Sequence, residues 1–152
     1  MRIHRSIAVA SLAGALALAV SGCSQHENTD PGAAPGEAGI RDVVSVYSQA
    51  LADGDGPRAC SLMSATAQHS LVARTASGDC LAAVKALHDG LSSEAAEALP
   101  SVEVTAITQE SPEAAAITVS FPEPGTDGAT AAVGGRSLHV VRVDARWGID
   151  TA

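Results

Sequence analysis

Three cysteines have the most distinctive chemistry in this chain of 152 residues. A cysteine can carry a lipid, form a disulfide or, as a thiolate, bind a metal. Zinc sites hold cysteines and histidines at short regular spacings, and neither Cys60 nor Cys80 has a C-x-x-C partner or a histidine at such a spacing. The sequence therefore disfavours a zinc site and leaves a disulfide or two buried free thiols for this pair.

Cys23 ends a hydrophobic N-terminal segment that has the composition of an export signal. Basic residues precede an apolar run over residues 7–20, which is shorter than the roughly 20 residues that a membrane-spanning helix needs. The stretch Val20-Ser21-Gly22-Cys23 resembles the bacterial lipobox, in which an aliphatic and two small residues precede an obligatory cysteine. The resemblance implies a lipoprotein signal peptide over residues 1–22 and a diacylglyceryl group on Cys23. An ordinary secretory signal followed by a chance cysteine is the alternative.

The negative charge of the chain disfavours electrostatic attachment to a membrane. Cleavage before Cys23 would remove Arg2 and Arg5 from the nine basic residues and none of the 17 acidic residues. Lys and Arg supply most of the affinity for nucleic acids and anionic lipids, so a strongly acidic domain binds neither well. Two acyl chains, by contrast, hold a protein stably, at about 0.8 kcal/mol for each buried methylene. We therefore expect no nucleic-acid partner and attachment to the extracytoplasmic face of the cell membrane through Cys23.

Export would also favour a disulfide over two free thiols for Cys60 and Cys80. Exported proteins meet an oxidising compartment, in which an even number of cysteines pairs readily. A disulfide that closes a loop of about 20 residues contributes roughly 3 kcal/mol in the chain-entropy account. We expect a disulfide between Cys60 and Cys80.

The segment after the anchor, residues 24–39, contains no large apolar side chain and is rich in Gly, Pro, Ala and polar residues. Such a segment cannot bury a core, so we expect a disordered tether. Its extended length is at most about 55 Å. The tether would hold the folded domain, expected over residues 40–152, away from the membrane surface.

Helical periodicity predicts that the first half of the domain is α-helical. Glycines and prolines separate the predicted helices, because glycine ends helices readily and proline opens them at their first position. The pattern predicts helices that start near residues 40, 57, 65 and 79, with Ala95, Ala98 and Leu99 extending the last one up to Pro100. The stripe of the first helix consists of Ile40, Val43, Val44, Tyr47 and Leu51.

After Pro100 the apolar residues alternate, which predicts strands. The predicted strands cover residues 102–106, 117–121 and 137–144, with a short last strand that contains Trp147 and Ile149. Residues 129–133 fit a short strand fragment. Helices followed by an antiparallel meander predict an α+β domain, with the N-terminal helices packed on one face of a curved antiparallel sheet.

Four stretches in this order resemble small exported domains of the nuclear transport factor 2-like superfamily, which are frequent in bacterial lipoproteins of GC-rich Gram-positive genomes. The stretches are VVSVYSQALADGDGPRACSLMS, DCLAAVKALHDGL, Val102-Glu103-Val104 and HVVRVDARWGID. The resemblance covers about residues 40–150 and implies a cone, in which helices plug a strongly bent sheet that can enclose a pocket. Members of the superfamily usually have glycine where this chain has Ala145, which leaves the geometry of the last turn open.

Tyr47, His139 and Trp147 are the candidate lining residues of such a pocket. Enzymes of the superfamily that resemble polyketide cyclases or ketosteroid isomerases use an Asp or His inside the cone with a Tyr as partner. His139 alternates with Val141 and Val143, so we expect these three residues on one face of a strand. If that face is the concave side of the sheet, His139 lines the pocket. The competing expectations are structural: a core tyrosine with a bonded hydroxyl, a satisfied edge or core histidine, and a tryptophan packed against a helix.

No acid–base motif of the superfamily accompanies Tyr47, so no catalytic residue carries over. The stretch Asp53-Gly54-Asp55-Gly56 resembles the start of a calcium loop, but its glycine position and the lack of a later glutamate break that pattern. We expect a turn there, and no metal or cofactor.

The sequence thus favours a lipid-anchored binding or scaffolding domain without catalysis, for an envelope protein or a small apolar ligand. The alternative is a small isomerase- or cyclase-like enzyme with an acid–base group in the cone. A buried carboxylate or histidine facing Tyr47 would favour the enzyme, and a filled cone would favour the binding domain.

Overall fold

The computed structural model describes residues 30–122 and 126–151 and shows an α+β domain. As the sequence predicts, helices precede a four-stranded antiparallel sheet. The predicted signal peptide, Cys23 and residues 24–29 lie outside the described residues. The elements in chain order are α1 (Gly36–Asp53), α2 (Gly56–Ser61), α3 (Ala65–Thr75), α4 (Cys80–Asp89), α5 (Ser93–Ala98), the 3₁₀ helix η1 (Leu99–Ser101), β1 (Glu103–Ser111), β2 (Ala114–Ser120), α6 (Asp127–Val133), β3 (Ser137–Val143) and β4 (Arg146–Thr151).

Side-chain caps explain why the helical half is divided into short helices. Four residues directly before a helix each accept a hydrogen bond from a backbone N–H in its first turn: Asp55, Ser64, Asp79 and Ser92. These bonds satisfy donors that a helix start leaves without a partner inside the helix. Because Ser92 caps α5, α5 is a separate helix, and the predicted extension of α4 up to Pro100 is wrong.

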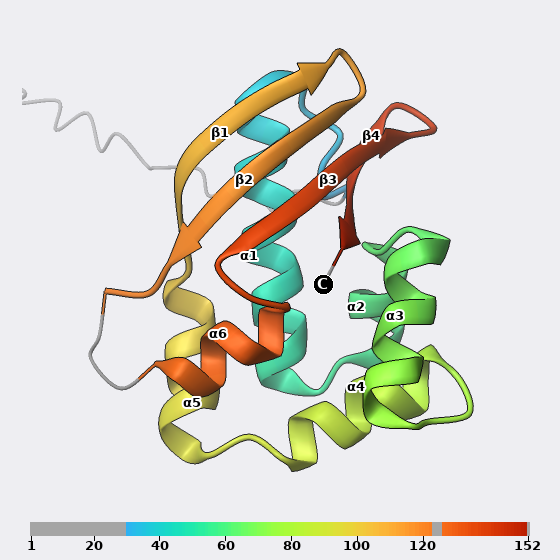
Figure 1. Ribbon diagram of the computed structural model, residues 1–152, viewed down its shortest axis with the longest axis vertical. Helices are drawn as coiled ribbons and strands as arrows, with labels where there is room; N and C mark the ends of the chain where they lie inside the picture. The colour runs from blue at the N-terminus through green and yellow to red at the C-terminus, as the bar shows by residue number, and fades with distance from the viewer. Residues whose placement is uncertain (1–29, 123–125, 152) are drawn as a thin grey trace, which may run out of the picture.

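The sheet is a meander in the order β1-β2-β3-β4, with α6 in the connection between β2 and β3. In Figure 1, α1 runs behind the sheet, α3 and α4 lie on the side of β4, and α5 lies beside α6. The core fills the space between α1 and the covered face of the sheet. Its largest fully buried side chains include Tyr47, Ile40, Leu51, Leu71, Leu99, Ile117, Leu138 and Ile149.

Residues 127–133 form helix α6, so the strand fragment predicted at 129–133 is wrong. Asp127 gives the first turn a negative charge, which favours a helix N-terminus, and Gly134 ends the helix in the left-handed conformation. The residues that α6 buries are Ala129, Ala132 and Val133, which have helical spacing. With three alanines in five residues, the window has little of the β-branched character that a strand requires.

The N-terminal segment over residues 30–35 is bound to the end of the sheet, which corrects the prediction of a tether up to residue 39. The backbone N–H of Gly32 donates to Asp42 Oδ2 at 2.9 Å, and the N–H of Trp147 donates to the Gly32 carbonyl oxygen at 3.0 Å. Arg146 Nη1 lies 2.8 Å from Asp30 Oδ1. Backbone hydrogen bonds and an ion pair need no large apolar side chain, so composition alone does not predict them.

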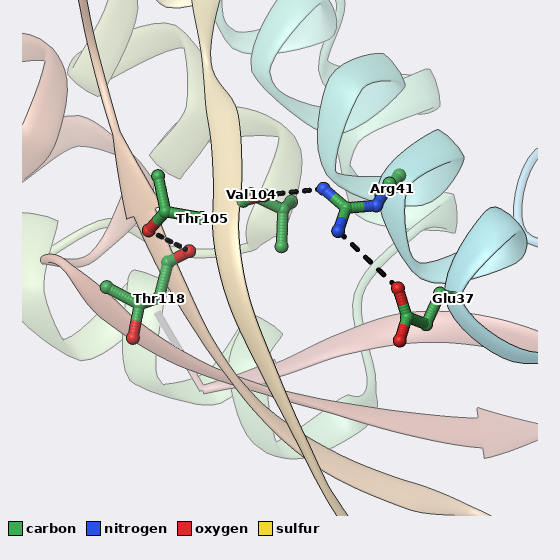
Figure 2. A network of polar contacts seen from close by, with 5 residues as sticks. All are labelled: Glu37, Arg41, Val104, Thr105 and Thr118. Atoms are coloured by element: carbon green, nitrogen blue, oxygen red, sulfur yellow. Dashed lines mark hydrogen bonds and ion pairs between the residues drawn. The ribbon is translucent and has the colours of Figure 1, made fainter.

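At the edge of the sheet formed by β1, a side chain of α1 is hydrogen-bonded to the strand. The guanidinium of Arg41 donates to the carbonyl oxygen of Val104 and lies 3.5 Å from Glu37 Oε2 (Figure 2). The hydroxyl of Thr105 donates to the carbonyl oxygen of Thr118 at 3.2 Å and so adds a bond between β1 and β2 (Figure 2). An occupied carbonyl on an edge strand makes that edge a poorer template for another chain.

The last hairpin turns through two residues, Asp144 and Ala145, which lie between the paired residues Val143 and Arg146. Both have positive φ, 50° for Asp144 and 66° for Ala145. Two consecutive left-handed residues are characteristic of a type I′ turn, whose twist matches that of the strands it joins. The structure thus defines the turn that the sequence left open, and it does so with an alanine in a conformation that glycine adopts at lower cost.

Candidate functional site

Tyr47 lies in the middle of the core and not on the wall of a cavity. Its side chain is fully buried, and its hydroxyl has no hydrogen-bond partner among the described residues. The expectation of a core aromatic therefore holds for the ring, whereas the expected hydrogen bond of the hydroxyl is wrong. Burial raises the pKa of Tyr47 to about 12, with a smaller opposing effect from the positive charge of Arg74. A phenol with this pKa stays neutral at physiological pH and is a poor general base.

In the part of the chain that the structure describes, no acidic or basic side chain is buried in the core with Tyr47, and Arg74, whose charge acts on it, is exposed. Among the described residues, Ser48 is the one buried polar or charged side chain outside the aromatic and aliphatic core. Every described Asp, Glu and His side chain reaches solvent at least in part. The space under the sheet is therefore filled with apolar side chains, and none of the residues that the structure describes places a desolvated carboxylate or imidazole there.

His139 is on the solvent side of the sheet. Its neighbours in β3, Leu138 and Val140, are buried against the helices, so His139 points to the other face. There its Nδ1 lies 3.6 Å from Glu110 Oε2, and both side chains are about half exposed, at 49% and 47%. His139 does share a face with Val141 and Val143, as alternation predicts, but this face is the outer one. His139, a candidate for lining the pocket, therefore does not line the covered interior of the sheet.

Trp147 is buried at the start of β4, with 2% of its surface exposed. Its indole packs against α1 at Gly39, where a Cβ atom would lie 2.7 Å from Trp147 Cδ1. The same Cβ atom would lie 1.9 Å from the carbonyl oxygen of Ala34, so glycine is required at this crossing. The indole Nε1 has no partner among the described residues. The expectation that Trp147 packs across the sheet against a helix is confirmed.

A groove of about 370 Å³ lies on the outer side of the last hairpin and is the best candidate for a binding site. We call it the β4 groove; it is lined by Pro31, by residues 61–65 and by residues 141, 143, 144 and 146–148 of the hairpin. The volume is within the range of small-molecule sites, roughly 300–1,000 Å³. Of the three candidates from the sequence, Trp147 lines this groove, while Tyr47 and His139 do not.

The segment that forms one wall of the groove is held on the edge of β4 by backbone hydrogen bonds. The N–H of Ile149 donates to the Leu62 carbonyl oxygen at 2.8 Å, and the N–H of Ser64 donates to the Ile149 carbonyl oxygen at 2.7 Å. The side-chain amide of Gln68 donates to the carbonyl oxygens of Cys60 and Met63 at 2.9 and 3.3 Å. These contacts give the wall a fixed shape and cover the edge of the sheet.

The disulfide supports this wall from the helical side. Cys60 at the end of α2 is bonded to Cys80 at the start of α4, with an S–S distance of 1.97 Å and a Cα–Cα distance of 6.1 Å. The pairing is the one expected from the sequence. Because Cys60 directly precedes the wall, the bond ties the position of the groove to the helices.

The floor and walls of the groove are mainly apolar, and its charged groups are at the rim. Its lining includes five large apolar residues, of which Val143 is exposed, Val141 is partly buried, and Leu62, Met63 and Trp147 are buried. At the rim, the ion pair with Asp30 raises the pKa of Arg146, and the Ser64 hydroxyl donates to Asp150 Oδ1 at 2.7 Å. The groove is thus suited to an apolar ligand with a polar end.

The hollow between α4, α5 and α6 and the acidic turn carry no such arrangement. A hollow of about 470 Å³ between α4, α5 and α6 is lined by alanine, leucine, glycine and serine residues, without a charged or aromatic side chain. Residues 53–56 form the predicted turn, in which Gly54 ends α1 and Asp55 caps α2. Within residues 30–122 and 126–151, no group of three or more His, Cys, Asp or Glu could hold a metal ion.

Sequence reasoning missed the β4 groove because its walls come from three separate segments. Pro31 was placed in the tether, and Met63 pairs with Ile149 as an isolated bridge outside every predicted strand. The one signal in the sequence was the alternation of Val141 and Val143, two apolar residues on the outer face of a strand.

Comparison with protein-family models, curated proteins and solved structures gives no match for this chain. None of the helices in the described part of the chain has the length and apolar character needed to cross a membrane.

Proposed function

We propose that this chain is a lipid-anchored binding or scaffolding module on the extracytoplasmic face of the cell membrane. In this proposal Cys23 carries the diacylglyceryl anchor, and the folded part is a cone of the nuclear transport factor 2-like type. The module acts without catalysis on an envelope protein or a small apolar ligand, which it binds in the β4 groove.

The filled interior is the observation that carries the non-catalytic part of this proposal. Tyr47 has no hydrogen-bond partner, and the described residues place no buried carboxylate or histidine near it. An enzyme of the cyclase or isomerase type needs an acid or base that contacts its substrate in a water-poor site. A core of aliphatic side chains around a neutral phenol supplies neither the group nor the space.

The order of the elements supports the cone. Several helices precede the antiparallel sheet, α1 crosses the covered face of the sheet, and irregular pairing positions interrupt the ladders of β1 with β2 and of β3 with β4. Such bulges bend strands and increase their twist, which a conical sheet requires. An experimentally determined structure of the domain would test this assignment through the curvature of the sheet.

The anchor is tested by replacing its thiol. We expect Cys23→Ala to abolish partitioning of the protein into a detergent phase, because stable attachment requires the two acyl chains and the acidic charge of the mature chain opposes binding to anionic lipid. Ser24→Ala is the matched control, since it changes the next residue and keeps the Val20–Cys23 pattern. A Cys23→Ala protein that partitions like the wild type and like Ser24→Ala would contradict the anchor.

Partners are best sought in the native envelope. Proximity labelling from the anchored protein, read by mass spectrometry, should enrich the same neighbours for the wild type and for a Tyr47→Phe variant. If the wild type converts a substrate or binds a ligand and a correctly folded Tyr47→Phe variant does not, the enzymatic alternative is favoured instead.

A further inference from the structure

The position of the β4 groove relative to Cys23 identifies the face of the domain that meets the membrane; this inference rests on the proposed lipid anchor. Pro31 lines the groove, and its neighbours on both sides are fixed to the hairpin that forms the floor. Asp30 is paired with Arg146, and Gly32 is hydrogen-bonded to Trp147. The described part of the chain therefore begins at the groove itself.

Only residues 24–29 separate this point from Cys23. The seven steps from Cys23 to Asp30 span about 25 Å at full extension. A domain of this size has a radius of gyration of about 14 Å, so the path over its surface to the opposite side is roughly 50 Å. The link is too short to reach around the domain, and the groove face must stay toward the bilayer.

The exposed lining of the groove combines one large apolar side chain, Val143, with the charged rim residues Asp144 and Arg146. Val143 on the groove is 57% exposed, and Leu81 on α4 is the other large hydrophobic residue exposed to this degree among those described, at 52%. The guanidinium of Arg146 is already paired with Asp30, and Asp144 and Asp150 stand close by in the sequence. An anionic headgroup finds no uncompensated cation in the lining of the groove, whereas a hydrocarbon chain finds apolar walls.

We propose that the β4 groove takes up one acyl chain of a phospholipid from the membrane in which the protein is anchored. The groove lies within reach of the bilayer surface, its volume of about 370 Å³ is in the range of sites for small apolar ligands, and its lining is mainly apolar. The acyl chain enters between residues 61–65 and the outer face of β3, while its headgroup stays outside the groove at the bilayer surface.

The test uses the full-length mature lipoprotein, reconstituted in vesicles of phosphatidylethanolamine and phosphatidylglycerol that contain a phospholipid with a diazirine in one acyl chain. After irradiation, adducts are mapped by mass spectrometry. We expect adducts on peptides that contain Leu62, Met63 or Val143. Because the protein's own acyl chains carry no diazirine, such adducts come from the bilayer.

Two matched variants make the test specific. Val143→Asp replaces the one large apolar side chain exposed on the groove and should reduce adducts there by about tenfold, because a bound acyl chain would lose this apolar contact and lie against a charge. Leu81→Asp makes the same change at the other exposed hydrophobic residue and should leave groove adducts within about twofold of the wild type, since a surface substitution has a small effect. Both positions are exposed, so both variants should fold, which a thermal melt checks.

Lipidation of Cys23 is measured on the same samples from the mass of the N-terminal peptide. An unmodified Cys23 would contradict the proposed anchor and the inference together. A lipidated Cys23 with no adducts in the groove, with equal adducts on α4, or with adducts that Val143→Asp leaves unchanged would overturn the inference alone.

Discussion

Replacing Tyr47 with phenylalanine removes one oxygen atom from the centre of the core and leaves the ring that packs there. The hydroxyl is buried and has no partner in the described structure, so the wild type loses its hydration on folding without gaining a hydrogen bond. An unsatisfied buried polar group costs about 1–3 kcal/mol. We therefore expect Tyr47→Phe to raise the free energy of unfolding by about 1 kcal/mol, whereas loss of a satisfied hydrogen bond would lower it.

The pKa of the phenol adds a dependence on pH with a definite sign. Below the ordinary value of 10.0 tyrosine is neutral in both states and contributes no pH dependence. Above 10.0 the unfolded state releases a proton that the folded state keeps until about pH 12, so the wild type loses stability over this interval. The slope is about 1.4 kcal/mol for each pH unit. The advantage of Tyr47→Phe over the wild type should therefore grow as the pH rises above 10.0.

Urea unfolding followed by the fluorescence of Trp147, the single tryptophan, measures both effects. Tyr47→Ala serves as a control for the ring and should cost about 3–5 kcal/mol, as other large-to-small core changes do. A Tyr47→Phe variant that is less stable than the wild type by more than about 1 kcal/mol would show that the hydroxyl has a partner, since that is the typical net value of such a bond. A constant difference between the two proteins across the alkaline range would refute the raised pKa.

Three further substitutions test the structure around the groove. Gly39→Ala should lower the free energy of unfolding by about 1–3 kcal/mol, because its Cβ atom would overlap Ala34 and Trp147, while Gly78→Ala, whose Cβ meets nothing within 4 Å, should be neutral or stabilising in the same urea titration. Ala145→Gly should raise the melting temperature, because it relieves an alanine at φ 66° at a gain of about 1 kcal/mol; an unchanged or lower melting temperature would contradict the left-handed turn. Serine at both Cys60 and Cys80 should cost roughly 3 kcal/mol, and labelling of free thiols at both positions in the exported wild type would contradict the disulfide.

The helices and most strands could be predicted because their signals are local. Capping side chains, helix-ending glycines and the change from helical to alternating periodicity all lie within a few residues of the boundaries that they mark. Helix α6 was missed since its signal, three small residues at helical spacing, is weak in a window rich in alanine. The binding of residues 30–35 to β4 was missed because it depends on partners more than a hundred residues away, such as the pair Asp30 and Arg146.

The candidate site shows the same division. Alternation placed His139, Val141 and Val143 correctly on one face of a strand, but it could not say which face the helices cover. That choice depends on the burial of Leu138 and Val140, which is a tertiary property. The groove itself combines Pro31, residues 61–65 and the last hairpin, and no local pattern connects three such segments.

The mass of the N-terminal peptide of the mature protein, isolated from membranes, tests the central claim most directly. The proposed anchor predicts a peptide that begins at Cys23 and carries the added mass of a diacylglyceryl group. A mature chain that begins elsewhere, or a Cys23 with an unmodified thiol, would contradict it.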